Sequence, residues 1–409
     1  MNVLRPVAYY EPEKIASSHL SNDIEETFVR EGFNLKIITP VPTRNVDNKI
    51  RLKYKKIKYE TRRDGKVKII RFNLMKERNN TFFRVCRYFL LIIKLYFIGK
   101  KQKDIDLIFI ESTPPIQGLL GAALKKKMKK PFVYVVQDIF PESLINSGII
   151  NKKGILWKIG RKIEDFTYKH ADKIVVISEK FKENIMDKGV IENKIEVISN
   201  WIDTDKVKYI DREKNFLFDK HNIDRKKFII SYCGNLGLTQ NLEMVIRAAK
   251  VLSDLDNILF VFVGEGKNKD NLMKLSRELE LKNLLFLPFQ SYDSISEVFS
   301  IGNIGLIVSK PNVGSNSVPS KFFTMLSASQ PILASFDLNT ELSKQIINAN
   351  CGYCVEPDNI NSFVQKILDI KQMHDKLKIM GVNGRNYVQE NFSKYRNTKL
   401  YIDVINDLL

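Results

Sequence analysis

The sequence is poor in the residues that build disulfide frameworks and metal sites. Its 409 residues include four cysteines, four histidines and two tryptophans. So few cysteines in a chain of this length do not indicate a disulfide framework, and we expect a reducing compartment. Cys351 and Cys354 alone are closely spaced, and no nearby cysteine or histidine supplies the second pair of ligands that a metal site needs. We expect these two cysteines to be small buried residues at the end of a strand.

Acidic residues are also in deficit. The 66 lysines and arginines outnumber 47 aspartates and glutamates, which leaves a formal net charge of +19. Such a balance favours anionic partners: nucleic acid, the phosphates of nucleotide sugars, or an anionic lipid surface. The basic clusters, such as Lys125–Lys130, contain neither a recognised nucleic-acid-binding module nor interleaved aromatic residues. We therefore expect no nucleic-acid partner.

Long apolar runs are absent as well. The longest, Tyr88–Ile98, is interrupted by Lys94 and is too short to span a bilayer, and the first residues do not resemble a secretion signal. Residues 84–103 nevertheless carry six basic residues and no acidic one. The segment 81–103 can lie in the interface of an anionic membrane, together with the lysines at 125–130. The alternative is a helix that faces the core and has a solvated basic end.

What is present is a regular alternation of short β-branched segments and helical patterns, which predicts a parallel α/β architecture. A polar, turn-rich stretch from residue 200 separates two such series. We predict two Rossmann-like, doubly wound domains, residues 1–205 and 206–390, with a C-terminal helix at 391–409 that packs back on the first domain. The expected strands are Val3–Tyr9, Leu35–Thr39, Lys68–Phe72, Leu107–Glu111, Phe132–Val136, Lys173–Ile177 and Ile195–Ser199, then Phe228–Cys233, Leu259–Gly264, Leu284–Leu287, Ile304–Val308, Ile332–Ser335 and Gly352–Val355.

Glycine turns follow two strands of the second series. In "SYCGNLGL" a β-run leads into Gly234 and Gly237 and then into a helix near Asn241, and Gly264 follows the next strand. Glycine lets a backbone approach a ligand closely, and a helix N-terminus offers free N–H groups to an anion. A plain tight turn between strand and helix is the alternative.

The stretch "SNSVPSKFFTMLSASQP", residues 315–331, has the composition of a helix N-terminus. Pro319 suits a first helical turn, and Ser317 or Ser320 can cap the helix. Lys321 would place a positive charge beside free N–H groups, a setting for a diphosphate. A capped core helix is the alternative, and in either case we expect the same buried face: Phe322, Phe323, Met325 and Leu326.

Four segments, in this order along nearly the full length, resemble glycosyltransferase family 4. They are "VVQDIFPES" (135–143), "VISNWIDTDKV" (197–207), "YCGNLGLTQNLE" (232–243) and "VPSKFFTMLSASQPILAS" (318–335). The likeness is greatest to the bacterial branch that builds O-antigen, capsule and colanic-acid repeats. It implies a GT-B fold, in which two Rossmann-like domains face each other across a cleft.

The resemblance also implies an activity. A retaining glycosyltransferase would move a sugar from a nucleotide-diphosphate sugar, with uridine as the expected base, to a polyisoprenoid-diphosphate-linked or polysaccharide acceptor. It would need no metal and no other cofactor. The product would serve O-antigen, capsule or exopolysaccharide synthesis. We expect a cytoplasmic protein that is peripheral on the inner face of the cell membrane.

The resemblance assigns candidate site residues. Asp138 is the candidate catalytic residue, in contact with the acceptor or the transferred sugar; an aspartate that caps its own turn is the alternative. Ser18, His19 and Gln137 would lie on the acceptor side, and for His19 a solvated loop histidine is the alternative. The candidate donor-binding residues are Gly234, Asn235, Leu236, Gly237, Gln240, Gly264, Ser320, Lys321, Phe322 and Thr324.

The sequence departs from the family pattern at several of these positions. Asn235 and Gln240 stand near the place of the Lys or Arg that neutralises the diphosphate in many relatives. Asn316 and Thr324 occupy the places of a glutamate pair, of which the second holds the donor ribose, and Gln137-Asp138 replaces a histidine. A threonine hydroxyl can hydrogen-bond to a ribose, but this bond is weaker than the charge-assisted bond that a glutamate would make. Two alternatives therefore stay open: a UDP-sugar 2-epimerase of the same fold, and a non-catalytic nucleotide-sugar-binding protein.

Overall fold

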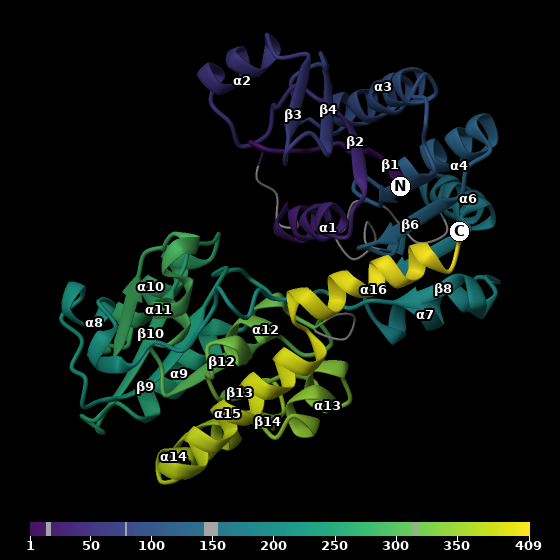
Figure 1. Ribbon diagram of the computed structural model, residues 1–409. Coiled ribbons are helices and arrows are strands. Elements are labelled where there is room, and N and C mark those ends of the chain that lie inside the picture. The colour runs from purple at the N-terminus through teal and green to yellow at the C-terminus, as the bar shows by residue number, and fades with distance from the viewer. Residues whose placement is uncertain (14–17, 78–79, 143–153, 314–317) are drawn as a thin grey trace. The chain divides into compact units, whose positions relative to one another are not determined.

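The computed structural model describes residues 1–13, 18–77, 80–142, 154–313 and 318–409. Its contacts divide the chain into two compact units (Figure 1). The first contains Met1–Asn200 and Asn397–Leu409, and the second contains Trp201–Arg396. These boundaries fall a few residues from the predicted ones at 205 and 390. Ser317 and Asn316 lie outside the described residues.

The first unit is built on an eight-stranded sheet with the order β3-β4-β2-β1-β5-β6-β7-β8. All neighbouring strands are parallel except β3 and β4, which form an antiparallel hairpin at one edge. The strand order reverses beside β1, which pairs with both β2 and β5. The strands are β1 Asn2–Pro6, β2 Asn34–Pro40, β3 Tyr59–Arg62, β4 Val67–Phe72, β5 Leu107–Glu111, β6 Phe132–Val136, β7 Lys173–Val176 and β8 Ile195–Val197.

Helices cover both faces of this sheet, which explains why β5 and β6 are apolar almost throughout. On one face, Phe109 packs against Phe28 of α1 and Tyr401 of α16. On the other, Ile108 and Ile110 share a core cluster with residues of α3, α4 and α6. The helices are α1 Ser18–Arg30, α2 Asn48–Lys55, α3 Thr81–Gly99, α4 Gln117–Met128, α6 Ile155–His170, α7 Glu179–Met186 and α16 Lys394–Asn406.

The C-terminal helix α16 begins in the second unit and continues into the first. Thr27 Oγ1 donates to Thr398 Oγ1 at 2.8 Å, and Asn397 Nδ2 donates to the carbonyl oxygen of Ser199 at 2.8 Å. Tyr401 is buried against Phe109. The part of α16 from Asn397 onward therefore belongs to the first unit and contributes buried residues to its core.

The second unit is a six-stranded parallel sheet with the order β11-β10-β9-β12-β13-β14. Its order reverses between β9 and β12. The strands are β9 Phe228–Cys233, β10 Ile258–Val263, β11 Leu284–Leu287, β12 Ile304–Val308, β13 Ile332–Ser335 and β14 Gly352–Val355. The helices are α8 Leu217–Lys220, α9 Leu242–Val251, α10 Lys269–Glu278, α11 Ile295–Phe299, α12 Ser320–Ser327, α13 Glu341–Asn348, α14 Ile360–Lys371 and α15 His374–Asn391.

The second sheet also has a core on each face. Ile229 and Val261 belong to a cluster with α11, α12 and α13, whereas Ile230 and Phe260 belong to a cluster with α9, α10 and α14. This alternation of neighbouring residues is the period of two that a strand imposes. In a doubly wound sheet, ligands bind at the carboxyl ends of the strands where the order reverses. That rule points to the ends of β1 and β5 in the first unit and of β9 and β12 in the second.

All thirteen predicted strands are present, each within a few residues of its expected bounds. In the first unit, the edge strand β3 and the helix α2 were not predicted. Neither is strongly apolar: the strand "YETR" has no buried residue, and none of the side chains of α2 is buried. The apolar periodicity that identifies a core element is therefore missing from both.

Candidate active site

Two glycine turns lie side by side at the carboxyl ends of β9 and β10. Gly234 and Gly264 have φ angles of +138° and +152°, which L side chains rarely adopt. A Cβ on Gly264 would overlap the carbonyl oxygen of Gly234. The Gly234 amide donates to the carbonyl oxygen of Val263 at 2.9 Å. Gly264 therefore requires glycine because the two backbones touch there, whereas Gly234 favours glycine because of its positive φ.

Lys321 reaches this pair of turns from α12. Its Nζ lies 3.8 Å from the centroid of the Tyr232 ring. The same Nζ lies 3.2 Å from the ideal Cβ position of Gly234. Tyr232 is held in place by a hydrogen bond of 2.8 Å from its hydroxyl to the carbonyl oxygen of Asn235. The aromatic ring supplies a cation–π contact. No carboxylate pairs with the ammonium group among the described residues.

This setting changes the proton affinity of the lysine. Burial lowers the pKa of Lys321 to about 7, an effect that the neighbouring Cys233 opposes only partly. A cation–π contact compensates a buried ammonium less than a carboxylate does. A bound anion would supply the missing counter-charge and favour the charged form.

The helix that carries Lys321 begins differently from the prediction. Pro319 is the N-cap of α12, and no side chain among the described residues caps the helix; the other predicted cap, Ser317, lies outside them. Ser320 is therefore the first helical residue, so the prediction that it caps the helix is wrong. The Phe322 amide donates to the carbonyl oxygen of Pro319 at 2.9 Å. The amides of Ser320 and Lys321 precede it in the first turn, where helices leave N–H groups without intrahelical partners.

The remaining candidates on α12 face inward. Phe322 is fully buried and packs edge-on against Phe323, so its side chain belongs to the core. Thr324 is 7% exposed, and its hydroxyl donates to the carbonyl oxygen of Ser320 at 3.4 Å. A hydroxyl turned back on its own helix is the usual arrangement for a buried helical threonine.

The loop after Gly234 brings further predicted residues together. Asn235 Nδ2 and Gln240 Oε1 lie 2.7 and 2.5 Å from the ideal Cβ position of Gly237. Leu236 is completely buried, with its amide and carbonyl bonded to Glu265 and Asn268. Leu236 therefore anchors the loop, while Gly234 and Asn235 are exposed on it.

The first unit has a pocket at the corresponding edge of its own sheet, at the ends of β1, β5 and β6. Ser18 and Gln137 line it, and the Gln137 amide donates to Ser112 Oγ at 2.9 Å. Asp138 and His19 are exposed and are not among the lining residues. The structure therefore brings together two of the four residues assigned to the acceptor side and to catalysis.

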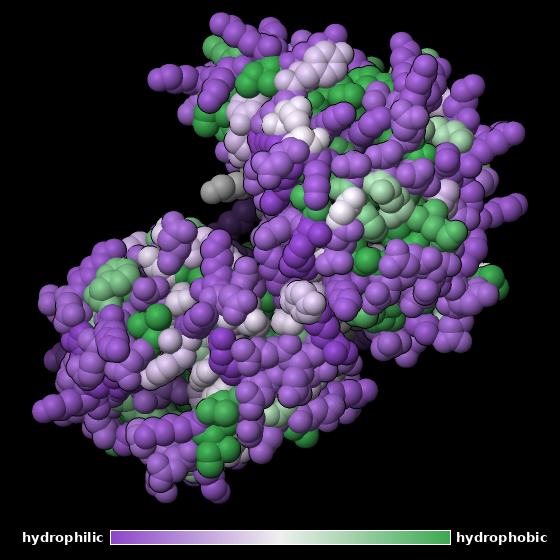
Figure 2. All heavy atoms as spheres, viewed as in Figure 1, coloured by the Kyte–Doolittle hydropathy of each residue, from purple (hydrophilic) through white to green (hydrophobic). Residues whose placement is uncertain are grey.

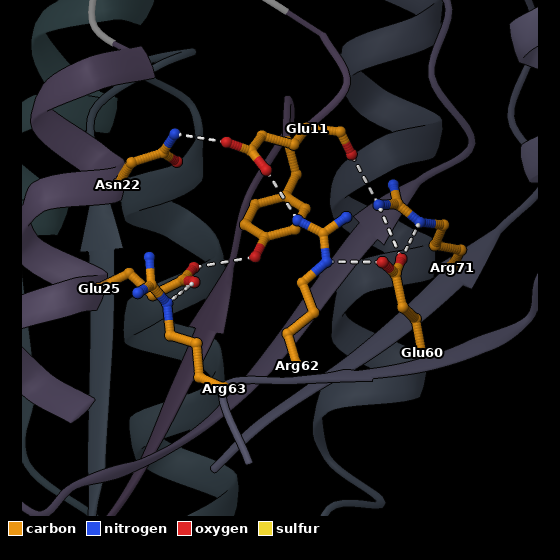
Figure 3. Close-up of polar contacts among 8 residues, drawn as sticks. Glu11, Asn22, Glu25, Glu60, Arg62, Arg63 and Arg71 are labelled. Atoms are coloured by element: carbon orange, nitrogen blue, oxygen red, sulfur yellow. Dashed lines mark hydrogen bonds and ion pairs between the residues drawn. The ribbon is translucent and has the colours of Figure 1, made fainter. Parts of the chain in front are cut away.

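A network of ion pairs borders this pocket (Figure 3). Glu11 accepts from Asn22 Nδ2 and from Arg62 Nη1, each at 2.7 Å. Arg71 Nη2 donates to the carbonyl oxygen of Glu11 at 2.6 Å, and Arg63 pairs with Glu25 at 3.1 Å. The network joins α1 and the β3–β4 hairpin to the segment that follows β1 (Figure 3).

Sequence reasoning missed several residues at these two sites. Tyr232, beneath Lys321, stands just before the glycine turn, where a strand-end aromatic gave no distinct signal. Glu111 ends a correctly predicted strand, and the rule that ligands bind at strand carboxyl ends would have selected it. Glu13 and Gln117 lie in segments without a motif. The described residues hold no group of three or more histidine, cysteine, aspartate or glutamate side chains suited to a metal ion.

Two family models match the chain, one on each side of residue 210. The model described as "Glycosyltransferase Family 4" matches residues 23–206, and "Glycosyl transferases group 1" matches residues 213–387. One curated relative, "Probable glycosyltransferase WbjE" of Pseudomonas aeruginosa, is 23% identical over 80% of this chain and 80% of its own length. "Putative colanic acid biosynthesis glycosyl transferase WcaI" of Escherichia coli K12 is 28% identical over 57% of this chain and 58% of its own length.

Solved structures of glycosyltransferases share the fold of this chain. A solved structure of Anabaena Alr3699/HepE in complex with UDP matches with a TM-score of 0.72 at 13% identity, over the full length of both chains. That likeness shows a GT-B fold, with two parallel α/β units. The chain belongs to glycosyltransferase family 4 and is a glycosyltransferase of the GT-B fold.

Proposed function

We propose that this protein transfers a sugar, with retention of anomeric configuration, from a UDP-sugar to a lipid-linked acceptor in the synthesis of a bacterial surface polysaccharide. The observation that supports the donor site most directly is the position of the Lys321 ammonium group. It lies at the Gly234 turn and has no carboxylate partner among the described residues. The UDP complex of the structural relative and the polysaccharide assignment of the Escherichia coli relative support the choice of donor and pathway.

The chemistry follows from charge. As the glycosidic bond to the donor diphosphate breaks, negative charge grows on the leaving phosphate, and a fixed ammonium with free helix amides stabilises it. The departing diphosphate would take up the acceptor proton on the same face, so no pair of catalytic carboxylates is needed. We assign Asp138 to contact with the acceptor or the transferred sugar, and we expect Asp138→Asn to lower turnover about tenfold.

A donor screen tests the donor site. The melting temperature of the purified protein is measured with UDP-, GDP- and dTDP-sugars, because a ligand that binds the native state raises it. We expect a rise with a UDP-sugar that Lys321→Met abolishes. Lys274→Met, an exposed lysine of α10 in the same unit, is the matched control and should keep the rise. No rise with any nucleotide sugar would contradict the proposal.

The same preparation separates a transferase from an epimerase. An epimerase converts the nucleotide sugar without an acceptor, whereas a transferase at most hydrolyses it slowly. We expect no epimer to form when the protein is incubated with the donor alone. Formation of a 2-epimer would favour the alternative function.

The membrane surface would be formed by α3 and α6. The exposed side of α3 carries Val85, Phe89 and Phe97, which are 61, 60 and 53% exposed and four or eight residues apart, so they form one stripe. On α6, Ile155 and Leu156 are 78 and 65% exposed. Both helices pack on α4, whose last turn holds Lys125, Lys126 and Lys127.

Apolar side chains flanked by lysines suit the interface of an anionic bilayer. Figure 2 shows that hydrophilic residues otherwise cover most of the face in view, with apolar residues in separate patches. No described helix is long and apolar enough to cross a bilayer. Flotation with anionic vesicles tests the surface: Phe89→Ser with Phe97→Ser should reduce binding, and the exposed Ile347→Ser in the second unit should not. Absence of vesicle binding by the parent protein would contradict this part of the proposal.

A further inference from the structure

A cavity of the second unit lies at the edge of its sheet opposite to the glycine turns. Its volume is about 530 Å³, which is within the range of sites that hold small molecules. Among its lining residues, Gly302 and Asn303 precede β12 and Pro331 precedes β13, so the cavity borders the amino ends of these strands. Gly234 and Gly264 follow β9 and β10 and lie at the other edge of this parallel sheet. The cavity is therefore separate from the proposed donor site.

The charged residues that line this cavity are all basic. Arg212, His374 and Lys378 are among the lining residues, which include neither aspartate nor glutamate in the described part of the chain. Asp211 and Asp375 adjoin two of these residues in the sequence, but they are not part of the lining. An anion in the cavity would therefore meet cations and no carboxylate.

Arg212 is hydrogen-bonded to uncharged groups. Its Nη1 donates to the carbonyl oxygens of Arg225 and Lys227 at 2.7 and 3.1 Å, and its Nη2 donates to Asn303 Oδ1 at 2.6 Å. Among the described residues no carboxylate forms an ion pair with it, because the adjoining Glu213 pairs with Arg225 instead, at 3.6 Å. A guanidinium carries five N–H donors, so these three bonds leave capacity for a further acceptor.

The helix α15 begins at the cavity with an unfavourable distribution of charge. Its first five residues, "HDKLK", contain a histidine and two lysines but one aspartate. Anions stabilise the N-terminus of a helix and cations destabilise it. The Leu377 amide donates to the Met373 carbonyl oxygen at 3.1 Å, and the three amides before it lie in the turn where helices leave N–H groups without intrahelical partners. A bound anion would remove this conflict, and such conflicts between sequence and fold are expected at functional sites.

The rest of the wall suits an organic group. Leu377 is buried, whereas Tyr209 and Val382 are 53 and 57% exposed, so an aromatic ring and an aliphatic side chain remain available for contact. Asn303 Oδ1 accepts from Arg212 and from the Ile229 amide, and its Nδ2 has no hydrogen-bond partner in the described ranges of the chain. Apolar walls with a few polar groups are typical of small-molecule sites.

We propose that this cavity binds the phosphate monoester of a small organic molecule, either a sugar phosphate or a nucleoside monophosphate. The phosphate lies between Arg212, Lys378 and the first turn of α15, and the organic group lies against Tyr209 and Val382. The dianion supplies the negative charge that the lining lacks. This site is additional to the proposed donor site and does not depend on the proposed function.

Titration calorimetry on the full chain tests the site. The probes are glucose 6-phosphate and uridine monophosphate, each compared with inorganic phosphate and with its own dephosphorylated form. We expect at least one ester to bind with a dissociation constant below about 1 mM, and about tenfold or more tightly than either comparison compound. The ester that binds more tightly identifies the organic group. Lys321→Met removes the ammonium group of the proposed donor site and should keep this binding.

Charge reversal at the start of α15 separates a binding role from a structural one. His374 and Lys378 are both exposed. His374→Glu with Lys378→Glu should weaken ester binding about tenfold or more, because the phosphate loses cationic contacts and meets carboxylates. The same double variant should raise the melting temperature of the unliganded protein by about one degree, since it places anions at a helix N-terminus. Lys274→Glu, at an exposed lysine of α10 in the same unit, is the control and should keep the binding.

Four results would overturn the proposal. The first is that no ester binds, and the second is that inorganic phosphate binds as tightly as both esters, which would indicate an adventitious ion only. The third is loss of ester binding in Lys321→Met, which would place the ester in the proposed donor site. The fourth is ester binding that the double variant of α15 leaves unchanged.

Discussion

At the scale of a single residue, Lys321 combines a structural cost with the donor-binding role that we propose for it. Its ammonium group contacts the Tyr232 ring and lies close to Gly234, and burial lowers its pKa to about 7. In the unfolded chain a lysine has a pKa near 10.4, so the unfolded state binds more protons between these two values. The lysine therefore destabilises the unliganded protein near neutral pH, and its contribution improves as the pH rises from about 7 towards 10.

From this we predict that Lys321→Met raises the melting temperature of the unliganded protein by a few degrees. Differential scanning calorimetry at pH 7 measures the change. The exposed Lys274→Met serves as the control and should shift the transition by less than about one degree. A lower melting temperature for Lys321→Met would show that the lysine stabilises the unliganded fold.

The same pKa predicts how donor binding depends on pH. A diphosphate ester keeps its charge near neutrality, so the pH dependence belongs to the protein. Above pH 7 an increasing fraction of Lys321 is neutral, and donor affinity should fall by up to about tenfold per pH unit between 7 and 9. Titration calorimetry with the UDP-sugar found in the donor screen measures it. Lys321→Arg stays charged throughout and should show a flat profile, while a flat profile in the parent protein would contradict the assignment.

At the scale of elements, the contact between the β9 and β10 turns decides the shape of the proposed donor site. Gly264 has a φ of +152°, and a Cβ there would overlap the carbonyl oxygen of Gly234. We predict that Gly264→Ala costs about 3 kcal/mol in the free energy of unfolding and weakens donor binding. Urea denaturation measures the first effect and the donor-induced thermal shift measures the second.

The matched control is Gly65→Ala in the turn of the β3–β4 hairpin. Gly65 also has a positive φ, +88°, but a Cβ there would meet nothing within 4 Å. Its substitution should cost only the backbone strain, about 1 kcal/mol. If both substitutions lower the free energy of unfolding equally, the contact between the β9 and β10 turns does not contribute to stability.

At the scale of the whole molecule, the net charge of +19 should govern association with membranes. The lysines of the last turn of α4 lie on a helix that packs between α3 and α6. Attraction of these lysines to anionic headgroups is screened within about 10 Å at 0.1 M salt, whereas the apolar contact of α3 is not. We predict that the fraction of protein floating with anionic vesicles falls severalfold between 0.05 and 0.5 M salt. Flotation that is unaffected by salt would assign the binding to the apolar stripe alone.

The sequence by itself determined the elements of the sheets and the family. Parallel strands covered on both faces are apolar along their whole length, so "LIFIE" and "FVYVV" identify β5 and β6 without tertiary information. The edge strand β3 was not predicted because an edge strand needs no apolar face, and the residues of β3 are charged or exposed. The glycine turns and the Pro-Ser-Lys segment could also be recognised in the sequence, because their backbone conformations limit those positions to a few residue types.

Only the tertiary structure decided what the candidate residues contact. Lys321 was selected from its position at a helix start, but its neighbour Tyr232 and its lowered pKa follow from how α12 packs beside β9. Leu236 belongs to the core, a distinction that a motif cannot make, whereas the burial of Phe322 was predicted from the apolar face of its helix. The pocket that holds Glu13 and Glu111 joins segments about a hundred residues apart, and it forms because β1 and β5 are neighbours in the sheet. Strand pairing over such separations depends on the packing of the whole unit, and local sequence patterns do not encode it.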